Sequence, residues 1–449
     1  MNAKTDRITK WLLVGATLLG IFVVPLNGQT YESGTTHPGL TSLAVFKTNL
    51  HRTLRAYGLS LGLFSKLALE PESMDPKSIE DLECKIKRLD PSGGYRPNEK
   101  NIQQSLGWLL AGTVLADIPR SSAKKHFFNS ENVNLRSADA FYSHLASSIR
   151  SPKPSTRHHH LALALMAMGN LVHVLQDMAS PTHAWNDFKI GQFEKLGSSF
   201  FDRGSAYERF VALTYERLGL PKYDGKPISR NRLSNFFTNS KSDGLADLTR
   251  KNHFSAGIIP KPVQVTSTLD EKKLQAILDT HLLLGKSGVE KIDLACAQQK
   301  TCHILGPHGA MLAYVIDENN QLRFFLDQDC YISTARHLLP LAVGYSAGLI
   351  DFLLRAKVSF EKNTDLVVLH DNGVTFSTAT VQIFWEDEVG HRKHIRTAKF
   401  DQKTSKDQSL LEFTTPKLPD KAQKLVALVV GKDSNGEEMV AFSVLKLEQ

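Results

Sequence analysis

The sequence lacks a glycine-rich phosphate loop and a dinucleotide-binding fingerprint, which excludes the common classes of nucleotide-dependent enzyme. It has no internal repeat and no low-complexity tract. Cysteine is scarce: the 449 residues contain four, and none has the CxxC spacing of a cysteine zinc cluster. The four positions are Cys84, Cys296, Cys302 and Cys330. We therefore expect none of the cysteines to belong to the metal site.

The composition indicates a globular protein of more than one domain. Hydrophobic residues make up 41% of the chain and charged residues 22%, which is typical of soluble proteins. A chain of 449 residues is too long for one ordinary core, so we expect two domains. The net charge of +8, spread along the chain, favours anionic partners such as phosphate esters or membrane surfaces.

The first 28 residues resemble a secretory signal. Lys4, Arg7 and Lys10 precede an apolar run over 11–26, and Asn27-Gly28 offers a small residue for cleavage. We expect residues 1–28 to be removed and the mature protein to be secreted or periplasmic. The alternative is a retained single-span anchor, because the run is near the lower length limit for crossing a bilayer.

Export makes one or two disulfides plausible for the four cysteines. Four cysteines allow three full pairings, so the sequence leaves the connectivity open. Cys296 paired with Cys302 or with Cys330 would close a local loop.

Helical periodicity runs through the first three quarters of the chain, and short alternating runs follow it. We predict a mainly α fold, with a helical domain over 29–356 and a small β-sandwich of immunoglobulin type over 357–449. A β-hairpin insertion at about 296–330 turns at 317–320. Helices are expected within 37–70 and at 106–116, 161–178, around 207–210 and 331–356, and strands at 366–369, 380–384, 411–413, 425–430 and 439–444.

Polar side chains interrupt the apolar helix over 161–178. His173 and Asp177 are four residues apart, so both project from one face into the protein interior. One explanation is that the two satisfy each other or a nearby backbone group, since buried polar groups need partners. Ser180-Pro181 then provides an N-cap and a first-position proline, and His183 falls on the first turn of the next helix. An imidazole pair with a carboxylate at a helix junction favours zinc.

The segment around these residues resembles a known family. It reads Gly169-Asn-Leu-Val-His-Val-Leu-Gln-Asp-Met-Ala-Ser-Pro-Thr-His-Ala-Trp-Asn186. The H-x3-D-x5-H spacing, with a proline before the last histidine, is similar to the central motif of the bacterial zinc-dependent phospholipase C family. That family is related to fungal-type zinc single-strand nucleases.

Four other segments match the family in order, so the resemblance spans roughly 35–356. They are Thr36-His37-Pro38, Asp117 followed by His126-Phe-Phe-Asn129 after a shorter gap than usual, Tyr207-Glu208, and the terminal helix segment 342–351.

The resemblance implies a secreted zinc-dependent phosphoric-diester hydrolase that binds two or three zinc ions. Asp117, His126, His173 and Asp177 would hold the first ion, and Asp177 would bridge to a second that also takes His37 and the mature N-terminus. A third ion would take His183 and Glu208. Asp117 is the implied general base. The substrate would be a phospholipid or another phosphodiester.

The sequence departs from the family at two positions of the implied ligand set. No tryptophan lies between Gly28 and His37, where the family's mature chain begins with one. The family also has a further histidine four residues before the glutamate, and here that position is Gly204. The third zinc site is therefore weakened, completed by Asp187 or Asp202, or absent.

Two other functions remain open at this stage. The same ligands would suit a zinc nuclease that acts on single-stranded nucleic acid, and a partial metal site would suit a non-catalytic protein that binds lipid or another surface. The C-terminal domain has a family precedent in lipid docking at membranes, although its acidic residues show no calcium cage. We assign structural or surface roles to the remaining histidines, namely His158-His159-His160, His253, His303, His308 and His337.

Overall fold

The computed structural model describes most of the chain between Thr36 and Leu447. The described residues are 36–69, 102–116, 136–185, 205–215, 217, 219, 221–265, 272–273, 276, 291–292, 301–363, 366–402, 409–414 and 417–447. The signal segment 1–28, Asp117, His126, Gly204, Cys84 and Cys296 lie outside them. Within those ranges, no helix has the length and hydropathy that a membrane span needs.

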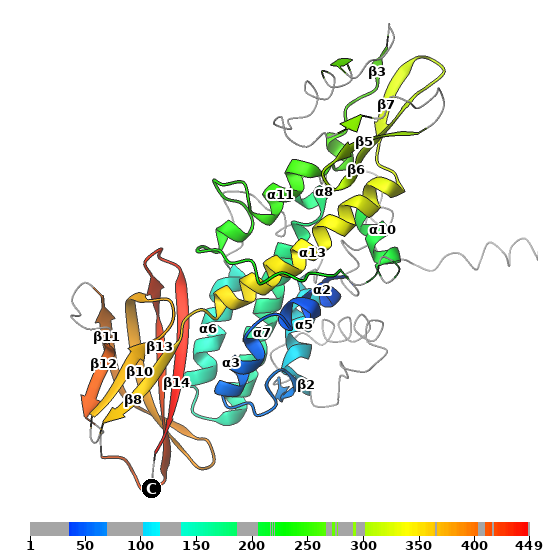
Figure 1. The fold of residues 1–449 in the computed structure, drawn as a ribbon. Helices are drawn as coiled ribbons and strands as arrows, with labels where there is room; N and C mark the ends of the chain where they lie inside the picture. Colours follow the sequence, from blue (N-terminus) through cyan, green and yellow to red (C-terminus); the bar gives the residue numbers. More distant parts are fainter. Residues whose placement is uncertain are drawn as a thin grey trace, which may run out of the picture.

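Helices form the central body, and the longest of them run through its middle (Figure 1). From Leu161 onward helix α7 is apolar on almost every face, and this part of the helix is buried in the body. The described helices are α2 (Thr36–Val45), α3 (Leu50–Ala56), η1 (Gly62–Phe64), α5 (Ser105–Leu115), α6 (Arg136–Arg150), α7 (Pro154–Asp177), α8 (Pro181–Ala184), α10 (Ala206–Thr214), η5 (Ser234–Phe236), α11 (Leu245–Asn252), η6 (Ala256–Ile258) and α13 (Gln328–Leu353).

Glycines allow the backbones of the body to approach closely. A Cβ atom on Gly348 of α13 would lie 1.8 Å from the carbonyl oxygen of Ile228, and Ile228 donates its N–H to the carbonyl of Gly344. The segment that contains Ile228 therefore crosses α13 at backbone contact distance. A short strand pair, β1 (Lys66–Ala68) with β2 (Ile102–Gln104), lies at the edge of the body.

A small antiparallel sheet lies at the N-terminal end of α13 (Figure 1). The expected hairpin within 296–330 is its pair β6 (Gly309–Ile316) and β7 (Gln321–Phe325). The sheet has five strands rather than two, in the order β3-β7-β6-β5-β4. The other strands are β3 (Val263–Gln264), β4 (Lys291–Ile292) and β5 (Cys302–Gly306). Strands of two residues are too short to show an alternating pattern in the sequence.

Two antiparallel sheets form a C-terminal β-sandwich, so the chain is mainly α with a β-sandwich, as predicted. One sheet has the order β11-β10-β13-β14 and the other β12-β9-β8. The strands are β8 (Val358–Asn363), β9 (Leu366–Asp371), β10 (Phe376–Asp387), β11 (Arg392–Asp401), β12 (Ser409–Thr414), β13 (Ala422–Asp433) and β14 (Glu438–Lys446). The sequence did not predict β8 or β11; β11 is mostly exposed and charged, so it lacks the apolar alternation of a buried strand.

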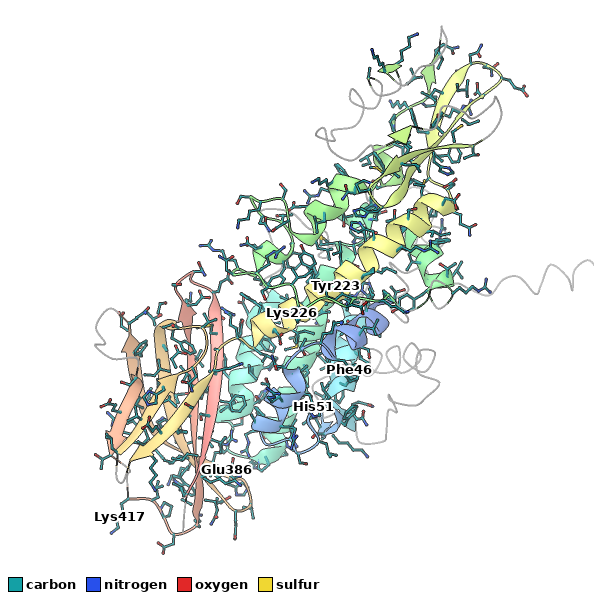
Figure 2. All side chains as sticks on the ribbon, viewed as in Figure 1. Phe46, His51, Tyr223, Lys226, Glu386 and Lys417 are labelled. Carbon is teal, nitrogen blue, oxygen red and sulfur yellow. The ribbon has the colours of Figure 1, made fainter. Side chains whose placement is uncertain are left out.

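A buried charge cluster joins the sandwich to the helices. The Glu386 side chain lies on the side of the sandwich that faces the helical body (Figure 2). Its Oε2 accepts a hydrogen bond of 2.7 Å from Arg392 Nε and lies 3.5 Å from an Arg157 nitrogen. Arg392 also donates to the carbonyl of Ile149 in α6, and Arg157 to the carbonyl of Gly390. Burial raises the pKa of Glu386, but Lys424 and Arg392, which both donate hydrogen bonds to its carboxylate, outweigh burial and hold that pKa below its usual value.

We expect Glu386→Gln to destabilise the protein by about 3 kcal/mol, because it leaves two buried guanidinium groups without a counter-charge. The measurement is the first urea unfolding transition. The control is Glu412→Gln on β12, an exposed position where a change within about 0.5 kcal/mol is expected. Equal effects of the two substitutions would show that the cluster contributes nothing to docking of the sandwich.

Candidate metal centre

The last turn of α7 places His173 and Asp177 on one buried face. Both side chains are 0% exposed, and His173 Nε2 lies 3.5 Å from Asp177 Oδ2. The i, i+4 spacing brings the two side chains together, as the sequence predicts. Helix α7 ends at Asp177, so the carboxylate sits where the chain turns toward α8.

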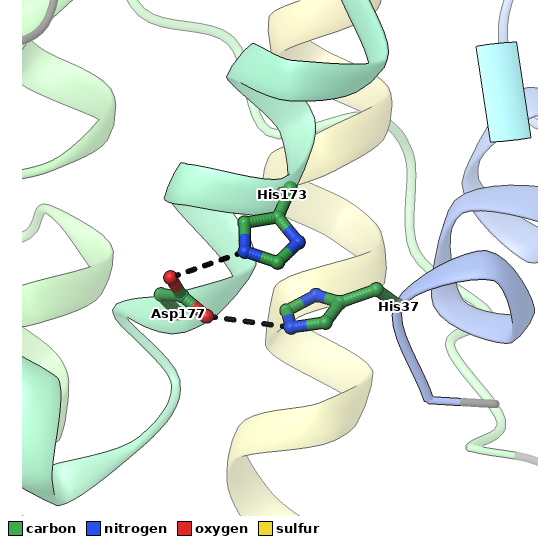
Figure 3. A group of neighbouring side chains, drawn as sticks. All are labelled: His37, His173 and Asp177. Carbon is green, nitrogen blue, oxygen red and sulfur yellow. Dashed lines mark ion pairs between the residues drawn. The ribbon is translucent and has the colours of Figure 1, made fainter. Parts of the chain in front are cut away.

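His37 reaches the same point from the first turn of α2. Its Nε2 lies 3.3 Å from Asp177 Oδ1, and its ring lies over that of His173 with 4.0 Å between the centroids (Figure 3). One ligand atom from each of His37, His173 and Asp177 lies within 4.8 Å of the other two.

Gln176 fixes the orientation of the His37 ring. The Gln176 side-chain amide donates from Nε2 to Thr41 Oγ1 at 2.9 Å and to Ser346 Oγ at 3.2 Å, so its Oε1 is the atom that faces His37. His37 Nδ1 lies 2.8 Å from that oxygen and must carry a proton to donate. The lone pair of neutral His37 is then on Nε2, facing the Asp177 carboxylate. Two electron-rich atoms in that arrangement need a cation between them, either a further proton or a metal ion.

His183 extends the cluster to a second carboxylate. It lies in the short helix α8, with Nδ1 3.7 Å from Asp177 Oδ2 and Nε2 3.0 Å from Glu208 Oε1. Ser180 precedes Pro181 at the N-cap position, but its hydroxyl makes no cap bond and donates instead to Glu208 Oε1 at 2.7 Å. The predicted N-cap position of Ser180 and first-position proline are confirmed, but a buried carboxylate takes the hydroxyl in place of a backbone N–H.

Glu208 is held by the start of its own helix. Ser205 and Glu208 form a capping box in which Glu208 Oε2 accepts the Ser205 N–H at 2.8 Å. One carboxylate oxygen thus satisfies the helix terminus, and the other faces His183 and Ser180. The sequence identified Glu208 as a ligand by resemblance alone; the Ser-x-x-Glu spacing was the available signal for its capping role.

The surroundings of Asp177 and Glu208 favour the ionised form of both carboxyl groups. Burial by itself would raise the pKa of Asp177, but His183, His173 and His37 outweigh burial and hold that pKa below its usual value. Burial likewise opposes ionisation of Glu208, and His183 with the hydrogen bonds from Ser180 and Ser205 lowers its pKa. Both acids are therefore carboxylates at neutral pH, which is the form that binds metal ions.

The structure brings together five of the seven predicted ligands: His37, His173, Asp177, His183 and Glu208. Asp117 and His126 lie outside the described residues. Ligands on one tetrahedral zinc ion are about 3.3 Å apart for nitrogen and oxygen. The contacts of Asp177 with the three imidazoles, at 3.3, 3.5 and 3.7 Å, have that spacing, so the donor set fits zinc.

Other residues with catalytic or ligand potential are not ligands of this centre. Segment 344–348 reads Gly-Tyr-Ser-Ala-Gly, which matches the GxSxG pattern of serine hydrolases. Ser346 is nevertheless fully buried in the middle of α13 and accepts a hydrogen bond from Gln176, so it forms no nucleophile elbow. His253 bonds Thr334 through Nδ1 and His337 through Nε2, the satisfied arrangement expected of a structural histidine. His308 stacks on His337, an association that the sequence did not predict.

The structure describes Cys302 and Cys330, so it tests only part of the disulfide prediction. Cys330 is a free, buried thiol, so a pairing of Cys296 with Cys330 is wrong. Cys302 is disulfide-bonded to a residue outside the described ranges, and the identity of its partner stays a prediction.

Distantly similar solved structures were found for this chain. No family model matches the chain, and no curated protein matches it. Two solved structures are similar to 94% of this chain over 100% of their own: an alpha-toxin of Clostridium perfringens from avian strain SWCP and the alpha-toxin of Clostridium absonum. Sequence identity is 12% and 10%, and the TM-scores are 0.28 and 0.27.

Proposed function

We propose that this chain is a secreted zinc-dependent phosphoric-diester hydrolase of the phospholipase C type. The observation that carries the proposal is the fully buried Asp177 carboxylate, which faces the imidazoles of three histidines at the spacing of zinc ligands. A carboxylate and three imidazoles that are buried together are not solvated by water, so they need a cation or other partners inside the protein. Three of these residues, His173, Asp177 and His183, belong to the segment that resembles the zinc phospholipase C motif, and His37 comes from a separate matching segment.

Each residue has a separate part in the proposed site. Asp177 neutralises positive charge and bridges His37 on one oxygen to His173 and His183 on the other. Gln176 keeps the proton of His37 on Nδ1, so that Nε2 is the donor atom directed at the centre. Zinc, when bound there, supplies positive charge for the phosphoryl oxygens and lowers the pKa of a bound water toward neutrality. Asp117 and His126 complete the ligand set in the proposal, with Asp117 as general base.

The proposed substrate class follows from the negative charge of a phosphodiester. A phosphodiester is an anion whose negative charge grows on its non-bridging oxygens during hydrolysis, and a site of several cations stabilises that growth. A phospholipid is the proposed substrate class, and the sandwich is the proposed module for approach to a lipid surface. The third zinc position, at His183 and Glu208, is proposed to be the weakest because Gly204 stands where the resembled family has a histidine.

The test is metal analysis of the purified mature chain, followed by assays on phosphatidylcholine vesicles, a chromogenic phosphodiester and single-stranded DNA. We expect at least two zinc ions per chain and zinc-dependent release of phosphorylated head group. Fewer than two ions, with no hydrolysis after zinc is resupplied, would overturn the proposal. Hydrolysis of DNA alone would identify a nuclease, and bound zinc without any hydrolysis would identify a binding protein.

A further inference from the structure

A second group of metal-ligand side chains lies outside the proposed centre, where the five-stranded sheet meets α13. His303 is on β5, Asp327 is the N-cap residue of α13, and Cys330 is in the first turn of that helix. One ligand atom from each lies within 4.8 Å of the other two. His303 Nε2 is 2.8 Å from Asp327 Oδ2, and Asp329 Oδ2 is 4.0 Å from the same nitrogen.

The geometry suits a small tetrahedral cation. Nitrogen, oxygen and sulfur ligands of one zinc ion are about 3.3 to 3.6 Å apart. The ligand atoms of His303, Asp327 and Cys330 need to move by roughly 1 Å or less to reach that spacing. The side chains of His303 and Asp327 are 23% and 25% exposed, so an ion can reach them from solvent, whereas Cys330 is buried beneath them.

The start of α13 pre-organises the carboxylate. Asp327 Oδ1 accepts the backbone N–H of Cys330 at 3.1 Å, which caps the helix and leaves Oδ2 directed at His303. A divalent ion with one thiolate and two carboxylates carries a net charge of −1. That charge is favourable at a helix N-terminus, where the partial charge of the helix is positive.

An explanation without a metal ion accounts for part of this arrangement of side chains. A helix cap and an ion pair account for Asp327 and His303, and packing against Ala310 and Ala313 accounts for the burial of Cys330. The Cys330 thiol also forms a side-chain hydrogen bond with Asp327. Neither that bond nor the packing explains why the thiol lies at ligand distance from His303 as well. Cys330 is 1% exposed, and burial raises the pKa of its thiol to about 12, which is the environment of an unreactive cysteine.

We propose that His303, Asp327 and Cys330, with Asp329 as the fourth ligand, bind one divalent metal ion of the zinc type. The ion links β5 to the first turn of α13, and so attaches the five-stranded sheet to the helix that passes through the body (Figure 1). This site is structural, and it is separate from the hydrolase centre.

Cobalt(II) added to the full-length mature chain tests the site, because a cysteine thiolate bound to cobalt gives a near-ultraviolet charge-transfer absorption. Imidazole and carboxylate ligands do not give that absorption, so the residues around Asp177 are silent in this measurement. The wild type is expected to develop the thiolate absorption to the intensity of one cobalt–thiolate bond per chain, with disulfides left intact and with further cobalt free to occupy the Asp177 centre. Absence of the absorption in the wild type would overturn the proposal.

Three variants assign the absorption to its residues. Cys330→Ser is expected to abolish it, and its persistence there would refute the site, because the thiolate would then belong to another cysteine. Asp327→Asn keeps a good N-cap residue and is expected to weaken cobalt binding at least 10-fold without loss of folding. Unchanged affinity in Asp327→Asn would also refute the site, even where Cys330→Ser proves unstable. Asp177→Asn is expected to keep the full absorption, so failure of this site and failure of the proposed hydrolase centre are distinguishable.

Discussion

Asp177→Asn is expected to remove at least one zinc ion per chain and to lower phosphodiester hydrolysis by more than about 100-fold. Asparagine has nearly the same size and keeps one oxygen, but it has no negative charge. Asp177 is the residue that three imidazoles share, at 3.3, 3.5 and 3.7 Å, so its charge cannot be replaced by another residue of the described centre. Zinc content by mass spectrometry and initial rates on a chromogenic phosphodiester measure the two losses.

The matched control is Asp420→Asn, which removes the same charge from an exposed turn of the sandwich. We expect it to leave zinc content and rate unchanged. A further comparison separates metal loss from misfolding: added zinc should raise the thermal midpoint of the wild type and of Asp420→Asn, because a ligand of the folded state stabilises that state. The midpoint of Asp177→Asn should respond much less. Wild-type zinc content in Asp177→Asn would show that Asp177 is a structural carboxylate.

Local sequence spacing predicted the parts of the centre that come from one stretch of chain. The apolar run around His173 and Asp177 required a buried helix, and four-residue spacing required both side chains on one face. Pro181 required the chain to begin a new helix, which turns His183 back toward Asp177. These relations depend on helical geometry alone, so they are visible without a structure.

Contacts between distant segments were not predictable in the same way. Gln176 and His37 are 139 residues apart, and nothing in either segment shows that an amide oxygen fixes the imidazole. Glu208 was identified by resemblance, but its hydrogen bond from Ser180 required the packing of α10 against α8. The cluster at Cys330 is hidden for a related reason: the sequence does not show β5 as a strand, so nothing in it places His303 beside the first turn of α13.

Gly169→Ala is expected to destabilise the protein by about 3 kcal/mol and to lower its zinc content with it. In an exposed helix the same substitution stabilises by about 1 kcal/mol, because alanine is the better helix former. At this position, however, the new Cβ would lie 2.1 Å from the carbonyl oxygen of Leu109 in α5. A Cβ on Gly112 of α5 would in turn lie 2.1 Å from the carbonyl oxygen of Met166. Backbone faces backbone on both sides, so no side-chain rotation relieves the clash.

The crossing of α5 and α7 also positions the centre. Gly169 is one helical turn before His173, and α5 ends at Leu115, two residues before Asp117. A methyl group at Gly169 forces the two helices apart, which displaces His173 from the α5 side of the body. Zinc affinity therefore falls together with stability, although no ligand is altered.

Gly436→Ala is the control for backbone effects on stability. Gly436 lies in the turn between β13 and β14 with φ of +80°, and a Cβ there would meet nothing within 4 Å. Its cost is expected to be about 1 kcal/mol, from the left-handed backbone conformation alone, with no loss of zinc. Urea unfolding and zinc analysis of both variants compare steric overlap with backbone strain. If Gly169→Ala is as stable as the wild type, the helices can separate without cost, and close packing of α5 on α7 is not what holds His173 in the metal centre.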